Sequence, residues 1–162
     1  MKIAFDFDET LVNYSDDFKE WSVNKLVLKL LLAILEQRKK VYIVTARCPA
    51  LSRKNIHNRA YVCKTRHRSG SKAFIGLVKF LDLPTVETFI LDRIPEDLAK
   101  YVEVVYTDGD LKGQILADLG INILIDDSEE QREDAQKHGV SSIHPADVSN
   151  LKQRLKEIGF IK

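Results

Sequence analysis

Two aspartates follow an apolar run near the start of the chain. Residues 3–12 read IAFDFDETLV, so that one residue separates Asp6 from Asp8 and Thr10 follows two positions later. Removing an ionised carboxylate from water is costly when nothing pairs it. A buried strand that ends in two carboxylates therefore points to a bound cation or to a reaction.

Polar residues also follow later apolar runs. Thr45 ends VYIVT, Lys112 lies near the start of an amphipathic segment, and the pair Asp126 and Asp127 follows INILI. In open α/β sheets, active sites lie beyond the C-terminal ends of the strands. This rule selects Asp6, Asp8, Thr45, Thr107 and the pair Asp126 and Asp127, which all stand at or just after the end of a predicted strand.

The elements that position these residues are read from periodicity and from turn residues. Strands are expected at 2–6, 41–45, 102–107, 121–125 and 140–143, with a further strand at 86–91. Helices are expected at 18–37, 71–81, 95–100, 110–119, 128–139 and 149–158, with Asp110 capping the fourth. This alternation predicts an α/β fold with a parallel sheet between two layers of helices.

The motifs together, in this order, resemble those of the haloacid dehalogenase (HAD) superfamily. That family has Asp-x-Asp-x-Thr, then a Ser or Thr after the second strand, a Lys at a helix start and a paired Asp after the fourth strand. The resemblance implies a Rossmann-like three-layer α/β/α fold, here as one domain over 1–162. Too few residues separate Thr10 from the first expected helix for a large cap domain to be expected there. An EF-hand calcium loop does not fit, because its glutamate at the twelfth position is missing.

The resemblance also implies a phosphatase mechanism. Asp6 is expected to attack phosphorus and form an aspartyl-phosphate. Asp8 is expected to protonate the leaving oxygen and then to activate water, with its pKa raised by crowding from the other carboxylates. Thr45 and Lys112 are expected to donate hydrogen bonds to the phosphoryl oxygens.

Magnesium is the cofactor that the resemblance implies. Its expected ligands are Asp6, the backbone carbonyl of Asp8, and Asp126 or Asp127. A hard cation with oxygen ligands suits this chemistry, since it screens the approach of a phosphate to a carboxylate.

The segment 46–72 is unusually basic. It contains eight lysines or arginines, two histidines and no acidic residue, whereas the chain as a whole has a net charge of only +1. We expect it to form a loop or lid after the second strand, with Arg47 directed at the substrate phosphate. Its Thr-Ala-Arg start is similar to that of several small nucleotidases, and the phosphatase part of phage-type polynucleotide kinases looks similar here. A basic segment with Tyr61 suits a nucleotide or nucleic acid phosphate, although a solvated basic loop is an equal alternative.

A structural zinc site is a separate hypothesis for the same segment. Cys48, His57, Cys63 and His67 are residue types that bind tetrahedral zinc. Their spacing differs from that of the zinc loop in some HAD heptose-bisphosphate phosphatases. The alternative is two free thiols and surface histidines.

The sequence therefore predicts a Mg²⁺-dependent phosphomonoesterase that acts on a nucleotide or nucleic acid phosphate. One alternative is a sugar- or heptose-phosphate phosphatase. Another is a non-catalytic HAD-fold module that binds nucleic acid or regulates. The longest apolar run, Leu30 to Leu35, is too short to cross a membrane, so a cytoplasmic protein without membrane partners is expected.

Overall fold

A five-stranded sheet forms the centre of the molecule in this computed structural model, which describes residues 1–52 and 83–162. Its order is β5 (Val102–Tyr106), β4 (Val41–Thr45), β1 (Ile3–Phe5), β6 (Ile123–Ile125) and β7 (Ser141–Ile143). All four neighbouring pairs are parallel. The predicted α/β fold with a mainly parallel sheet is confirmed.

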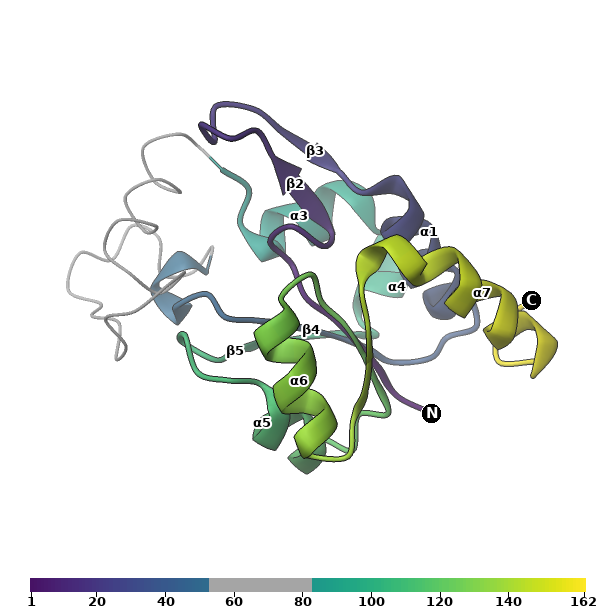
Figure 1. The fold of residues 1–162 in the computed structure, drawn as a ribbon. Helices are drawn as coiled ribbons and strands as arrows, with labels where there is room; N and C mark the ends of the chain where they lie inside the picture. Colours follow the sequence, from purple (N-terminus) through teal and green to yellow (C-terminus); the bar gives the residue numbers. More distant parts are fainter. Residues whose placement is uncertain (53–82) are drawn as a thin grey trace.

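Helices cover both faces of this sheet, and Figure 1 shows α5 and α6 on the side away from α1 and α7. The helices are α1 (Lys25–Glu36), α3 (Val86–Arg93), α4 (Glu96–Ala99), α5 (Gly113–Asp118), α6 (Glu129–Lys137) and α7 (Val148–Glu157), with short 3₁₀ turns at Pro49–Leu51 and Pro145–Asp147. Alternate residues of a strand point to opposite faces. Ile3 and Phe5 accordingly join the core under α1 and α7, while Ala4 joins the core under α5 and α6.

The prediction of a helix from residue 18 is wrong at its start. Residues Val12–Tyr14 (β2) and Trp21–Val23 (β3) instead pair as an antiparallel hairpin before α1. Phe18 has a φ of 57°, which a helix does not allow, and the Asn24 side chain caps α1 by accepting from the Val27 amide at 3.3 Å. Trp21 and Val23 are two residues apart, which is the spacing of a strand. Phe18 lies three residues before Trp21, and Val23 lies three before Leu26, so helical spacing is present as well and periodicity alone could not separate the two.

The predicted strand at 86–91 is also wrong, because this segment is helix α3. Thr85 caps it, since its hydroxyl accepts from the Thr88 amide at 3.0 Å. The α3 side chains Val86 and Phe89 are buried in the core. Thr85 after Pro84 was a helix-start signal that the apolar, β-branched composition of the segment obscured.

The capping of α5 differs from the prediction as well. Asp110 does not cap it; the N-cap residue is Lys112, without a side-chain cap of its own. Two α6 side chains satisfy the first amides of this turn: Gln131 accepts from the Lys112 amide at 2.9 Å and Asp134 from the Gly113 amide at 2.8 Å. Helix α6 is capped by Ser128, whose hydroxyl accepts from the Gln131 amide at 3.3 Å.

Several other predicted strands and helices are found in the structure. The strands at 41–45 and 102–107 and the helices at 95–100, 128–139 and 149–158 are found within a few residues of their predicted bounds. The helix predicted at 71–81 and most of the basic segment lie outside the described residues. Among the helices of residues 1–52 and 83–162, none has the length and apolar character needed to span a membrane.

Candidate active site

Parallel pairing brings the acidic ends of β1 and β6 together. Phe5 is in register with Ile125, and the Asp6 amide donates to the Ile125 carbonyl at 2.8 Å. Asp6 and Asp126 thus leave neighbouring strands at the same level of the sheet. Both are buried, with 7% and 1% of their surface exposed.

Lys112 joins these two carboxylates. Its Nζ lies 2.7 Å from Asp6 Oδ1 and 2.7 Å from Asp126 Oδ2, and the whole residue is only 1% exposed. Residues far apart in the chain therefore form one buried cluster. The structure thus brings together three of the candidate site residues, Asp6, Lys112 and Asp126.

The electrostatics of this cluster are unbalanced. Burial raises the pKa of Asp6 well above its ordinary value, and the charge of Asp126 adds to this rise while Lys112 opposes it. Burial also raises the pKa of Asp127. Burial alone lowers the pKa of Lys112, but Asp6 and Asp126 more than offset it, so this pKa is raised and the amine stays charged. Three carboxylates against one ammonium leave an excess of negative charge.

A divalent cation would neutralise the excess negative charge of these three carboxylates. Asp6, Asp126 and Asp127 can each offer one carboxylate oxygen, and these oxygens lie within 4.8 Å of one another. Carboxylate oxygens in small number are the ligands that Mg²⁺ uses beside phosphate. The donor set thus suits Mg²⁺, and a cation there would balance the excess of negative charge.

Other side chains hold the Asp126–Asp127 segment in place. One nitrogen of Arg132, on α6, donates to the carbonyls of Asp126 and Asp127 at 2.9 and 2.7 Å. The Ser128 amide donates to Asp126 Oδ1 at 2.9 Å. The backbone thus turns at the end of β6 with both carboxylates on the side of Asp6.

Thr10, the last residue of the first motif, links Asp6 to Asp127. Its fully buried hydroxyl lies 3.1 Å from Asp6 Oδ2 and 3.4 Å from Asp127 Oδ1, and it accepts from the Asp127 amide at 3.2 Å. A threonine hydroxyl has one hydrogen to donate, so it serves one of the two carboxylates at a time. The shorter distance favours Asp6.

Asp8 has different surroundings from the other three acids. Arg47 donates to both of its oxygens, from Nε at 2.8 Å and from a terminal nitrogen at 2.7 Å, and the Tyr14 hydroxyl also donates to it. The carboxylates that crowd together are Asp6, Asp126 and Asp127, so the expected crowding of Asp8 by them is not what the structure shows. Asp8 instead faces a cation.

Arg47 itself lies differently from the prediction. Its side chain is fully buried: besides Asp8 it donates to the Pro84 carbonyl at 2.8 Å, and it lies 4.8 Å from the centre of the Phe7 ring. The guanidinium therefore binds protein groups instead of facing outward to a phosphate. A buried arginine needs an acidic partner, and Asp8 is that partner for Arg47.

Thr45 is buried at the end of β4, the strand next to β1. Its hydroxyl oxygen accepts from the Arg47 amide at 3.2 Å. This bond uses the oxygen as an acceptor, so the hydroxyl hydrogen is available to donate.

The zinc prediction is largely outside the described residues, since His57, Cys63 and His67 all lie in 53–82. Cys48 is described, and it is disulfide-bonded. The expectation of a free thiol at Cys48 is therefore wrong, and a sulfur in a disulfide is not the thiolate that zinc binds. The described part of the basic segment is 46–52, so the predicted lid also falls mostly outside the described residues.

Comparison with known proteins adds no relative: no protein-family model and no curated protein matches this chain. The site thus rests on its own geometry. Sequence reasoning missed Tyr14, Gln131 and Arg132, which hold Asp8, Lys112 and the acidic pair. Only Gln131 had a signal. It stands three residues after Ser128, the spacing of a capping box, and that motif predicts a side-chain bond to the Ser128 amide instead of to Lys112.

Proposed function

We propose that this chain is a Mg²⁺-dependent phosphomonoesterase of the HAD type, with Asp6 as the nucleophile. The observation that supports it most is the cluster of Asp6, Lys112 and Asp126 at neighbouring strand ends, with Nζ at 2.7 Å from each carboxylate. A buried lysine between two acids holds the nucleophile in place and donates to the oxygens of a phosphoryl group that approaches it.

In the first step a carboxylate oxygen of Asp6 attacks phosphorus while the bond to the leaving oxygen breaks. The products are an aspartyl-phosphate on Asp6 and an alcohol, whose oxygen takes a proton from Asp8. Lys112 and the Thr45 hydroxyl donate to the phosphoryl oxygens as charge shifts onto them. Asp6, Asp126 and Asp127 would hold Mg²⁺, which would supply the positive charge that lets an anionic phosphate come close to a carboxylate.

In the second step water attacks the phosphorus of the aspartyl-phosphate and Asp8 accepts its proton. Inorganic phosphate leaves, Asp6 is regenerated, and Asp8 holds the proton for the next leaving oxygen. Arg47 and Tyr14 donate to Asp8 and fix its carboxylate in one orientation beside the site. Such donors are the partners of an ionised carboxylate, so these contacts support the base role of Asp8, while its role as acid is proposed from the motif alone. The basic segment 46–72 supports a nucleotide or nucleic acid phosphate as substrate.

The test is hydrolysis of p-nitrophenyl phosphate with Mg²⁺ and with a chelator. We expect turnover only with Mg²⁺, and none in Asp6→Asn. Asp16→Asn is the matched control, because Asp16 is an exposed acid on the hairpin. Acid quenching during turnover should leave a phosphate on Asp6, detected by mass spectrometry of the peptide. Full activity in Asp6→Asn, or activity that ignores the chelator, would contradict the proposal.

A further inference from the structure

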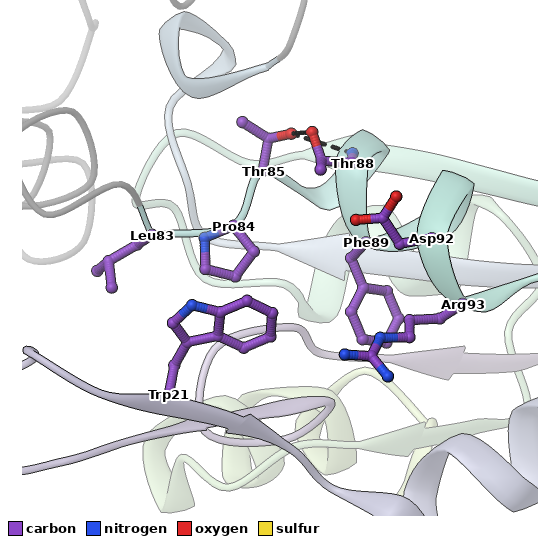
Figure 2. A pocket seen from close by; sticks show the side chains of 8 residues that line it. All are labelled: Trp21, Leu83, Pro84, Thr85, Thr88, Phe89, Asp92 and Arg93. Carbon is purple, nitrogen blue, oxygen red and sulfur yellow. Dashed lines mark hydrogen bonds between the residues drawn. The ribbon is translucent and has the colours of Figure 1, made fainter.

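A small pocket lies between the β2–β3 hairpin and helix α3, beside the site. Its volume is about 210 Å³, and the residues that line it are Trp21, Leu83, Pro84, Thr85, Thr88, Phe89, Asp92 and Arg93. Figure 2 shows the Trp21 indole extending from the hairpin toward Pro84, with the Phe89 ring beside it. None of these residues belongs to the acidic cluster.

Three contacts place this pocket next to Asp8. Tyr14 and Trp21 are directly opposite each other in the hairpin, so their side chains lie on the same face, and the Tyr14 hydroxyl reaches Asp8. Pro84 accepts from Arg47, which pairs with Asp8. The Phe89 ring packs edge-on against Phe7 at 5.4 Å.

The position of the pocket determines which part of a substrate reaches it. In the proposed mechanism Asp8 protonates the leaving oxygen, so the group attached to that oxygen lies on the Asp8 side. The pocket is on that side, and the phosphate is on the side of Asp6 and Lys112. It is therefore placed for the leaving group.

The lining of the pocket indicates the kind of group. An indole that is 39% exposed offers one face for stacking, and Pro84 and Phe89 add apolar walls. Polar groups stand beside them. Thr85 donates to Thr88 at 2.7 Å, and no described residue accepts the hydrogen of the Thr88 hydroxyl in return. Asp92 and Arg93 are exposed at the rim and offer an acceptor and a donor.

Size and chemistry together select a nucleobase. Pockets for drug-sized ligands measure about 300–1,000 Å³, so this one suits a single ring system. A nucleobase has a flat face for the indole and an edge with both donors and acceptors. We infer that this pocket binds the base of a nucleoside phosphate, with Trp21 as the stacking platform, and the inference rests on the proposed phosphatase function for its link to the leaving group.

Trp21 is the only tryptophan in the chain, so its fluorescence reports directly on the pocket. We would titrate wild type and Asp6→Asn with adenosine and with cytidine, exciting where neither absorbs. We expect saturable quenching in both proteins and none with ribose 5-phosphate. Leu91→Ala, an exposed residue of α3 outside the pocket, should leave the quenching unchanged. No quenching by either nucleoside, or equal quenching by ribose 5-phosphate, would overturn the inference.

Kinetics give a second, independent readout. Trp21→Ala should lower kcat/KM for nucleoside monophosphates by about 10- to 100-fold more than for ribose 5-phosphate, and Trp21→Phe by less, given what stacking on an aromatic ring contributes. An equal loss on both substrates would count against the pocket. Quenching by nucleosides without any hydrolysis would support the pocket and reject the phosphatase. Hydrolysis without quenching and without a preference for a base would support the phosphatase and reject the pocket.

Discussion

Asp6 and Asp8 are separated by one residue but have opposite electrostatic surroundings. Asp6 shares one lysine with Asp126, and burial raises its pKa. Asp8 receives both forks of a fully buried arginine and the hydroxyl of Tyr14, whose own pKa burial raises, so that the phenol keeps its proton and donates it. Two positions of the loop after β1, with one residue between them, thus meet an acidic cluster and a buried arginine. This difference is what allows the two residues to have different roles.

Replacing Asp8 tests its role separately from that of Asp6. Asp8→Asn keeps the shape of the side chain but cannot take a proton from water. With p-nitrophenyl phosphate, whose leaving group needs no acid, we expect a burst of one nitrophenolate per enzyme and then a steady rate lower by about 10²- to 10⁴-fold. Rapid-quench kinetics measure both phases. Turnover at the wild-type rate, or a loss without any burst, would contradict this role for Asp8.

At the scale of elements, α6 positions α5 and therefore Lys112. Gln131 and Asp134 of α6 accept from the first amides of α5, at Lys112 and Gly113. The close approach depends on Gly113: a Cβ there would lie 2.5 Å from the Asp134 carboxylate, 2.6 Å from its backbone oxygen and 2.3 Å from the His138 ring. We therefore expect this helix contact to determine how far the amine of Lys112 reaches into the site.

Gly113→Ala should therefore separate the two helices. We expect a loss of about 1–3 kcal/mol in the free energy of unfolding from overpacking, together with a lower kcat, because Lys112 moves with its turn. Gly139→Ala is the control: Gly139 has a φ of 77°, and no atom lies within 4 Å of the point that an added Cβ would occupy, so this change should cost about 1–2 kcal/mol through backbone strain while kcat stays the same. Urea unfolding and phosphatase assays measure both. A Gly113→Ala protein with unchanged kcat would show that the contact does not position Lys112.

At the scale of the whole molecule, the stability of the protein is linked to protons and to Mg²⁺ through the acidic cluster. Burial raises the pKa of Asp6 and Asp127 in the folded state above that of an unfolded chain. In the metal-free protein these groups thus favour folding below the unfolded-state pKa of about 4. That contribution is lost as the pH rises through the higher folded-state values.

Mg²⁺ should act in the opposite direction, because it binds the deprotonated carboxylates. We expect the rise in Tm caused by Mg²⁺ to be larger near pH 8 than near pH 5, with about 2.7 kcal/mol of stabilisation at 100 times the Kd. Asp6→Asn should reduce both the pH dependence of the metal-free protein and the Mg²⁺ effect. Thermal unfolding followed by circular dichroism measures these shifts. A Mg²⁺ effect that is the same at both pH values would contradict the linkage.

Local patterns in the chain were sufficient to predict the layers of the fold and the acidic part of the site. The chain alternates short apolar runs that end in acids with amphipathic segments. This pattern predicts buried parallel strands with polar residues at their C-terminal ends. The acids Asp6 and Asp126 followed from that pattern, whereas Lys112 was singled out only by the order of the family motifs. The hairpin and α3 did not, since their apolar spacing fits strand and helix alike and a positive φ at Phe18 and a Thr85 cap decide between them.

The surroundings of Asp8 depend instead on tertiary packing. The partnership of Asp8 with Arg47 and Tyr14, and the pocket between Trp21 and Phe89, join segments whose distance in the chain carries no local signal. Their contacts arise from the way the hairpin and α3 pack beside β1. Periodicity and capping depend on residues that are close in the sequence, so they can be read from it. The partner of a buried charge depends on which distant segments pack together in the core.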